Sequence, residues 1–346
     1  MKYFGIVLLL LLILWEGCGG VPKFVLPYEF RTIEKKADFI KYYSTWVKGK
    51  KFFLDPGHGG KDRNNKGFRE SSVEADINLN VALALRDLLV LAGGEVLLSR
   101  NKDTTVELKD RSLLANKSGA NIFISIHHNA AGEKEDIWTN YTSTYYHANE
   151  NDYEYEPCQR DLARYIQRDL SYSMRNSGGT SSFDGTYSDY NIYPGQGFSV
   201  LRLTKIPAVL VECGFTTSEY ESDLITIKEF NNVEAWGIFR GLCRYFKNGI
   251  PEIKYINTKD TVTKDSLNIS FSLQDSSGIN LNTLSVFVDA LNYRNYNLNG
   301  KGGLLIIQIP SLHTGNHTIR IIAANKNGNY AFPFYYSIFI PNNMDK

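Results

Sequence analysis

Apolar, strand-like runs alternate with amphipathic segments over residues 51–246, and this alternation limits the fold more than any other feature of the chain. In the segments between the runs, apolar side chains recur every three or four residues, as on the buried face of a helix. The alternation predicts an α/β fold with a mostly parallel central sheet flanked by helices. The expected strands are residues 51–54, 95–100, 121–126, 143–146, 198–203 and 208–211, and the expected helices are residues 71–91, 108–117, 158–173 and 231–246.

The sequence changes character after residue 250, where short alternating runs follow one another without helices between them. Turn sequences such as Asp-Ser-Ser-Gly and Asn-Gly separate these runs over roughly ninety residues. This pattern predicts a small C-terminal all-β sandwich. Residues 273–279 and 313–318 loosely resemble the immunoglobulin-like (Ig-like) modules of bacterial surface proteins. We therefore expect two folded domains, one over residues 50–249 and an Ig-like domain over residues 250–346.

The charges of the chain nearly cancel, with 38 Lys and Arg residues against 37 Asp and Glu residues among 346. This balance argues against a protein that binds nucleic acid through general electrostatic attraction. Cys158, Cys213 and Cys243 are widely spaced, and they provide neither a disulfide framework nor a Cys-rich zinc site. We expect them to be small, buried, apolar side chains.

The amino terminus has the pattern of an export signal. Lys2 precedes an apolar run over residues 4–15 that is too short to span a bilayer comfortably. We expect residues 1–17 to be a signal peptide that is removed. The protein is then exported, to the cell envelope or periplasm or into the medium.

Cys18 is the candidate site of a membrane anchor. Gly17 and Cys18 resemble the processing site of bacterial lipoproteins, in which the cysteine becomes the lipid-bearing first residue, although Trp15 and Glu16 fit that pattern poorly. Membrane attachment through a lipidated Cys18 is therefore expected, with ordinary secretion as the alternative. Residues 18–49 are expected to form a tether and a short first element.

Four side chains with catalytic potential stand at the ends of the expected elements. His58 and His127 follow two strands, Glu74 lies near the start of a helix, and Glu212 follows the strand at residues 208–211. Sites in α/β folds gather beyond the carboxyl ends of the strands, so these side chains are expected at one edge. Two imidazoles and a carboxylate with one open position form a common catalytic zinc set. The remaining carboxylate would act as the general base.

Each of these residues also has a simpler structural explanation. Glu74 completes a capping-box pattern with the serine three residues before it, in which the glutamate satisfies a backbone donor at the helix start. Glu70 is an alternative metal ligand. His128 is an alternative to His127, although alternation along a strand points the two side chains in opposite directions. Glu212 fits equally well as the first polar residue after a buried strand.

Four motifs, taken together and in order, resemble the zinc-dependent N-acetylmuramoyl-L-alanine amidases over about residues 51–246. The resemblance implies that His58, Glu74 and His127 are zinc ligands. It also implies that Glu212 is the catalytic carboxylate. His128 stands where the family more usually has a small residue, which bears on the shape of the pocket. The motifs are Leu-Asp-Pro-Gly-His-Gly-Gly at 54–60, Glu-Ala-Asp-Ile-Asn-Leu at 74–79, Ser-Ile-His-His-Asn-Ala at 125–130 and Pro-Ala-Val-Leu-Val-Glu-Cys-Gly-Phe at 207–215.

The same resemblance implies a zinc enzyme that hydrolyses the amide bond between N-acetylmuramic acid and L-alanine in peptidoglycan. Two alternatives stay open: another zinc peptidase acting on stem peptides, and a non-catalytic envelope-binding protein. The domain over residues 250–346 is expected to position the enzyme or to bind a wall or protein partner. Residues 176–193 are expected to form a surface loop that lines the site, with gating of the site as the alternative.

Overall fold

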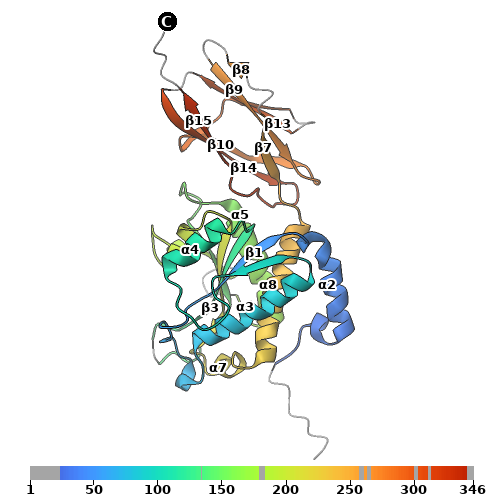
Figure 1. Ribbon diagram of the computed structural model, residues 1–346, viewed down its shortest axis with the longest axis vertical. Helices are drawn as coiled ribbons and strands as arrows, with labels where there is room; N and C mark the ends of the chain where they lie inside the picture. Colours follow the sequence, from blue (N-terminus) through green and yellow to red (C-terminus); the bar gives the residue numbers. More distant parts are fainter. Residues whose placement is uncertain are drawn as a thin grey trace, which may run out of the picture.

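The computed structural model describes residues 24–133, 135–178, 184–256, 261–262, 266–299, 303–310 and 313–340. The expected signal peptide and Cys18 lie outside these ranges. The described chain forms an α/β unit followed by a unit of antiparallel strands (Figure 1). Within the described ranges, no helix combines the length and the apolar character needed to cross a membrane.

A single sheet forms the centre of the α/β unit. Its strands are β1 (Lys51–Pro56), β2 (Glu95–Leu98), β3 (Ile122–Asn129), β4 (Ser143–Tyr146), β5 (Thr186–Ser188) and β6 (Ala208–Phe215). They lie in the order β2-β1-β3-β6-β4-β5. Neighbouring strands are parallel except β4, which runs antiparallel to β6. The prediction of a mostly parallel sheet is therefore confirmed.

Helices cover both faces of this sheet. One face carries α2 (Ile33–Val47), α3 (Glu74–Leu91), α5 (Pro157–Met174) and α8 (Lys228–Lys247), joined to the strands by one apolar core. The other face carries α4 (Leu108–Lys117) and α6 (Ser199–Arg202) in a smaller apolar cluster. The helix α8 lies close to α5, since a Cβ atom at Gly237 would be only 2.7 Å from the Cα atom of Leu170. The predicted helical layers are thus confirmed.

Residues 198–203 are not the expected strand, because they contain the helix α6. Periodicity cannot separate a strand from a helix in so short an apolar run. Side chains from α4 stabilise the helical form. Ser112 donates a hydrogen bond to the Val200 carbonyl (3.0 Å), and Asn116 donates one to the Leu203 carbonyl (2.8 Å). These contacts join residues almost ninety positions apart, so the local sequence does not reveal them.

The first element is longer than expected, because α2 has 15 residues. Thr32 caps its start by accepting a hydrogen bond from the backbone of Lys35, and Val47 at its end is fully buried. The chain before α2 packs beside the start of α8. There the rings of Phe24 and Phe230 lie 5.1 Å apart. Phe24 is therefore one of the partly buried side chains that pack against the core of the α/β unit.

The expected loop over residues 176–193 contains ordered structure where it is described. β5 pairs with β4 in the sheet, and a 3₁₀ turn follows at Asp189–Asn191. Asp189 is fully buried and accepts a hydrogen bond from the backbone of Phe198 (2.7 Å). Residues 179–183 lie outside the described ranges, so gating of the site stays a prediction.

Two antiparallel sheets follow the α/β unit, and they confirm the expected C-terminal all-β fold. One sheet has the order β11-β10-β14-β15, and the other has the order β12-β13-β9-β7 with β8 paired to β9. Phe271, Leu305 and Ile321 belong to the apolar core between them. The Ig-like character stays a prediction. The strands are β7 (Glu252–Tyr255), β8 (Thr261–Val262), β9 (Ser266–Gln274), β10 (Ile279–Val288), β11 (Leu291–Tyr293), β12 (Tyr296–Asn299), β13 (Leu304–Pro310), β14 (Gly315–Asn325) and β15 (Tyr335–Ile340).

Buried polar contacts hold this sandwich against the α/β unit. Arg320 on β14 donates hydrogen bonds to the carbonyl of Tyr153 (2.6 Å) and lies 3.1 Å from the Glu156 carboxylate. Asn329 donates to the carbonyl of Tyr245 (2.9 Å) near the end of α8. Figure 1 shows the sandwich at the opposite end of the α/β unit from α7 (Glu221–Leu224), the short helix that follows β6.

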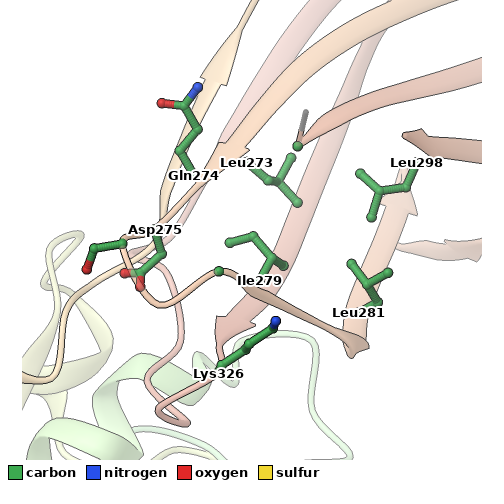
Figure 2. Close-up of a pocket in the computed structure, with 10 residues that line it drawn as sticks. Leu273, Gln274, Asp275, Ile279, Leu281, Leu298 and Lys326 are labelled. Atoms are coloured by element: carbon green, nitrogen blue, oxygen red, sulfur yellow. The ribbon is translucent and has the colours of Figure 1, made fainter. Parts of the chain in front are cut away.

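The sandwich has a hollow of about 680 Å³ beside the ends of β9 and β10. Figure 2 shows Leu273, Ile279 and Leu298 on its apolar side, with Asp275 and Lys326 at the polar side. None of the four predicted site residues lines it. It is therefore separate from the histidine-bearing edge of the central sheet.

Candidate metal centre

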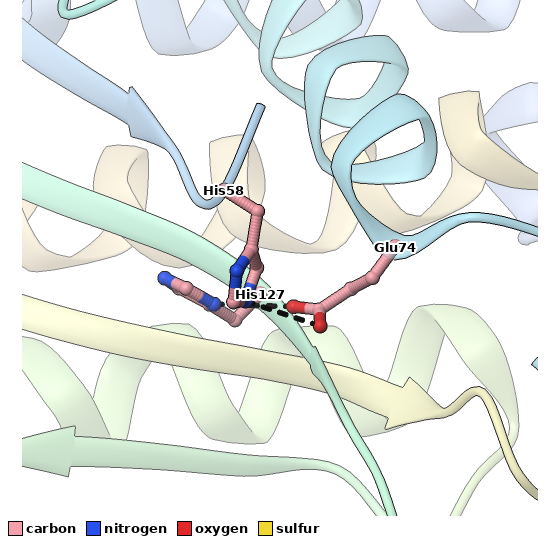
Figure 3. A group of neighbouring side chains, drawn as sticks. All are labelled: His58, Glu74 and His127. Carbon is pink, nitrogen blue, oxygen red and sulfur yellow. Dashed lines mark hydrogen bonds and ion pairs between the residues drawn. The ribbon is translucent and has the colours of Figure 1, made fainter. Parts of the chain in front are cut away.

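The carboxyl ends of β1 and β3 bring the two predicted histidines together. His58 lies two residues after the end of β1, and His127 lies near the end of β3, which is the parallel neighbour of β1. Glu74 is the first residue of α3, whose start lies at the same edge. Figure 3 shows both imidazole rings beside the Glu74 carboxylate. Residues up to 69 positions apart in the sequence thus form one group.

The geometry of this group suits a metal ion. The Nε2 atom of His58 lies 3.2 Å from one oxygen of Glu74, and the Nδ1 atom of His127 lies 3.1 Å from the other. The ligand atoms that the three side chains offer all lie within 4.8 Å of one another. Two imidazole nitrogens and one carboxylate oxygen are donors that zinc accepts. The donor set of these residues therefore fits a zinc ion.

Glu74 is not a helix cap, contrary to the simpler explanation. It is the first residue of α3 rather than the third, and its Oε1 atom accepts hydrogen bonds from the Asn78 side chain (3.0 Å) and the His128 backbone (3.1 Å). Burial alone would raise the pKa of Glu74. Hydrogen bonds and positive charge from His127 and His58 outweigh burial and hold that pKa well below its ordinary value. The carboxylate is therefore ionised and ready to bind a cation.

Glu70, the alternative ligand, lies outside this group. Its side chain is 73% exposed and pairs with Lys66 at 2.8 Å. The structure therefore brings Glu74, and not Glu70, to the two histidines.

The turn around His58 is held in an uncommon backbone conformation. His58 has φ of 59°, in the left-handed region that few residues other than glycine adopt. Next to it, Gly57 lies directly against the His127 ring, because a Cβ atom there would overlap the ring and lie 2.6 Å even from Nδ1. The glycine therefore makes the room that the second histidine occupies.

Two buried arginines fix this turn, and the sequence analysis missed both. Arg111 donates hydrogen bonds to the carbonyls of Pro56 (2.8 Å) and His58 (3.0 Å) and pairs with the buried Asp55 at 2.8 Å. Arg100, two residues after the end of β2, also donates a hydrogen bond to the Pro56 carbonyl (2.9 Å). No local pattern marks them, since each lies more than forty positions from the carbonyls of this turn that it binds.

Glu212 stands beside His127, on the neighbouring strand β6. In the paired register of β3 and β6 it lies opposite His127. Although Glu212 is partly exposed, its Oε2 atom is buried and has no hydrogen-bond partner among the residues that the structure describes. Burial, and to a smaller extent the negative charge of Glu74, raises the pKa of Glu212 well above its ordinary value. Burial and the neighbouring negative charge thus both favour the protonated form of this carboxyl.

His128 points away from the group, as strand alternation predicts. It is 3% exposed, and its ring nitrogens lie 2.8 Å from the Asn78 side-chain oxygen and 2.9 Å from Glu234 on α8. His128, Cys213 and Glu234 form a second group of side chains with metal-binding atoms close together. Cys158, Cys213 and Cys243 are all buried, as expected.

A hollow of about 430 Å³ opens beside the histidines. His58, His127, Asp62, Lys61 and Arg111 are among the residues that line it. A substrate entering this hollow would therefore meet the two imidazoles along its wall.

Comparison with known proteins points to one family. The family model for N-acetylmuramoyl-L-alanine amidases matches residues 52–244. The germination-specific N-acetylmuramoyl-L-alanine amidase of Bacillus subtilis strain 168 is 30% identical over 237 residues, which cover 64% of this chain and 89% of that protein. The N-acetylmuramoyl-L-alanine amidase LytC of the same organism is 28% identical over 205 residues, or 58% of this chain and 36% of that protein.

A solved structure supports the same assignment. The crystal structure of an N-acetylmuramoyl-L-alanine amidase from Clostridium difficile 630 matches with 31% identity and a TM-score of 0.50, covering 58% of this chain and 98% of that one. The family match spans more than half of this chain and ends before the sandwich. The chain therefore belongs to the N-acetylmuramoyl-L-alanine amidases, the enzymes that hydrolyse the amide between N-acetylmuramic acid and L-alanine in peptidoglycan.

Proposed function

We propose that His58, Glu74 and His127 bind a catalytic zinc ion and that Glu212 transfers protons during hydrolysis of the peptidoglycan amide. One observation carries this proposal: the two imidazoles approach opposite oxygens of the same buried, ionised carboxylate, at 3.2 and 3.1 Å. Three donors directed at one point are the usual protein contribution to a catalytic zinc site. The general dependence of this family on zinc agrees with the donor set.

The residues around the ligands favour metal binding. Asp62 lies 2.8 Å from the Nδ1 atom of His58, so that nitrogen keeps its proton and the Nε2 lone pair faces inward. Asn65 donates a hydrogen bond to the Oε2 atom of Glu74 (2.7 Å), and Asn78 holds the Oε1 atom. In such a site zinc supplies Lewis acidity toward a carbonyl and an acidic water molecule.

Glu212 is the group best placed to move the proton in this proposal. It takes a proton from the attacking water and returns it to the nitrogen that leaves as the amine of L-alanine. Burial of its Oε2 atom and its raised pKa favour a carboxyl that can hold the proton between these two events. The lactyl carbonyl would lie in the hollow beside His58 and His127.

Zinc content and product analysis of purified protein test the assignment. Glu212→Gln should keep one zinc ion per chain and lose amidase activity by about 10²-fold or more, because only the proton carrier is removed. His127→Ala should lose both zinc and activity. Glu70→Ala is the matched control and should retain both, since that carboxylate is exposed and points elsewhere.

Mass spectrometry of the peptidoglycan digest identifies the bond that is cut. Release of stem peptides with a free L-alanine amino group is expected. Cleavage within the stem peptide would instead indicate a peptidase, and an active Glu212→Gln variant would refute the proposed base. A wild-type chain that retained no zinc after purification in zinc-containing buffer would refute the metal site.

We also propose that the chain is exported and that Cys18 carries the lipid anchor. An enzyme that acts on peptidoglycan must reach the cell envelope, which supports export. The proposed division is a signal peptide at 1–17, a tether and first element at 18–49, a catalytic domain at 50–249 and an Ig-like domain at 250–346 that binds the wall or a protein partner. Cys18→Ser should abolish labelling by a fatty-acid analogue and release the protein from the membrane fraction; unchanged labelling would refute lipidation.

A further inference from the structure

A buried chain of hydrogen bonds leads from α8 to the proposed metal ligand Glu74. It starts at Asn231, which donates to the Oε2 atom of Glu234 (3.0 Å). The Oε1 atom of Glu234 lies 2.9 Å from one ring nitrogen of His128, and the other ring nitrogen lies 2.8 Å from the Asn78 oxygen. Asn78 in turn donates to the Oε1 atom of Glu74 (3.0 Å). All five residues are at most 3% exposed.

The acceptors along this chain fix the direction of each hydrogen bond. The Asn78 amide nitrogen faces the Glu74 carboxylate (3.0 Å) and the Gly57 carbonyl (3.4 Å), which only accept hydrogen bonds. The Asn78 oxygen is therefore the atom directed at His128. Because that oxygen and the Glu234 carboxylate are both acceptors, both ring nitrogens of His128 donate.

His128 could instead belong to a metal site with Cys213 and Glu234, since their ligand atoms lie close together. A metal ion there would have to displace one of the two hydrogen bonds that already engage the ring. The hydrogen-bonded arrangement accounts for both ring nitrogens of His128 and for both oxygens of Glu234. The geometry therefore favours hydrogen bonds over a second metal site at this position.

We propose that His128, held by Glu234, is a positioning residue that orients Asn78 and through it the Glu74 oxygens presented to the metal. This inference rests on the proposed zinc site. Without His128, the Asn78 amide loses the donor that fixes its rotation, and Glu74 loses a fixed donor on Oε1. Hydrogen-bond partners of this outer kind typically change metal affinity by about 10–100-fold.

Two variants of the His128–Glu234 pair separate its effect on the metal ligand from its effect on folding stability. His128→Leu alone leaves the Glu234 carboxylate buried without its partner, which lowers stability strongly. Replacing both, in His128→Leu/Glu234→Leu, removes the unpaired charge and is expected to recover most of that stability. In both variants the Asn78 side-chain oxygen lacks the hydrogen bond that the His128 ring donates to it.

Zinc dissociation constants from chelator competition, together with melting temperatures, test the proposal. The single variant should melt roughly 10 °C lower than wild type, and the double variant should melt within a few degrees of wild type. Both should bind zinc about 10-fold or more weakly. Asn78→Ala should weaken zinc binding similarly, and adding it to the double variant should cause little further loss.

His147 supplies the matched control. It is also buried, with both ring nitrogens near carboxylates, at 2.9 Å from Asp189 and 3.1 Å from Glu154, but these contacts do not connect it to Glu74. His147→Leu should lower the melting temperature and leave the zinc dissociation constant unchanged.

Three results overturn the inference. Wild-type zinc affinity in the double variant would show that the pair only stabilises the fold. Equal loss of affinity in His147→Leu would show that any loss of packing loosens the site. A second zinc ion that is lost with the double variant would assign His128, Cys213 and Glu234 to a metal site. A wild-type chain that binds no zinc would instead refute the proposed function on which the inference rests.

Discussion

Gly57→Ala offers a sharp test of how the metal centre is built. The backbone at Gly57 is not in the left-handed region, so the substitution adds no conformational strain there. The added Cβ atom would overlap the His127 ring, and even the Nδ1 atom would lie 2.6 Å from it. Since non-bonded carbon atoms pack at about 3.5–4.0 Å, the ring must move by at least about 1 Å.

A movement of this size exceeds what a metal site tolerates, because metal–ligand distances hold to within about 0.2 Å. We expect Gly57→Ala to lose His127 as a ligand and to weaken zinc binding by at least about 100-fold. Overpacking should cost about 1–3 kcal/mol of folding free energy. The variant should therefore fold and yet lose zinc and amidase activity together.

The assay combines zinc stoichiometry, amidase activity and the unfolding free energy from urea titration. Gly132→Ala is the control, because a Cβ atom at Gly132 has no atom within 4 Å and its backbone needs no glycine; it should retain all three properties. A folded Gly57→Ala protein with normal zinc content would show that the His127 ring does not occupy this position in the metal-bound enzyme. That result would refute the steric reasoning.

Three further predictions concern the metal, the pH dependence and the contact between the two units. Removing zinc with EDTA should lower the melting temperature by about 5–10 °C, since an ion present at 100 times its dissociation constant stabilises the fold by about 2.7 kcal/mol; an unchanged calorimetric transition would contradict this. Burial raises the pKa of Glu221 from 4.5 to about 7, so its folded form holds the proton more tightly, and stability should fall as pH rises from about 4.5 through 7, by roughly 3 kcal/mol. Urea titrations at pH 5 and pH 8 should show a smaller fall for Glu221→Gln, and an equal fall would contradict the assignment. Arg320→Ala should leave the buried Glu156 without its cation and lower the free energy of unfolding by about 3–5 kcal/mol. Proteolysis between the two units should then be faster, and wild-type cleavage rates would show that this contact is dispensable.

The parts of the site that follow strand ends could be predicted from the sequence. His58, His127 and Glu212 each follow an apolar run that marks a strand, and a parallel sheet gathers the carboxyl ends of such runs at one edge. The strands β3 and β6 continue past His127 and Glu212 for a few residues. The local sequence around Glu74 did not by itself predict a metal ligand, because its pattern favours a helix cap. The family resemblance selected it over Glu70, and the structure brings Glu74 to both imidazoles.

The supporting residues could not be predicted, because nothing local marks them. Arg111 binds the Asp55 carboxylate 56 positions earlier, and Glu234 meets His128 across 106 positions. Each would look like an ordinary charged residue on a helix surface. The error at residues 198–203 has the same origin, since the short apolar run takes its helical form from contacts with α4.

With the proposed lipid on Cys18, the contact between Phe24 and Phe230 would set which side of the enzyme faces the membrane. Phe230 lies at the start of α8, one turn before the Glu234 that contacts His128, so the chain enters the fold on the side of the metal centre. Six residues lead from Cys18 to Phe24, and even fully extended they reach only about 20 Å. A lipid on Cys18 would therefore hold the catalytic edge close to the bilayer surface and leave the sandwich pointing outward, so that the anchored enzyme would reach only the membrane-proximal layer of the wall.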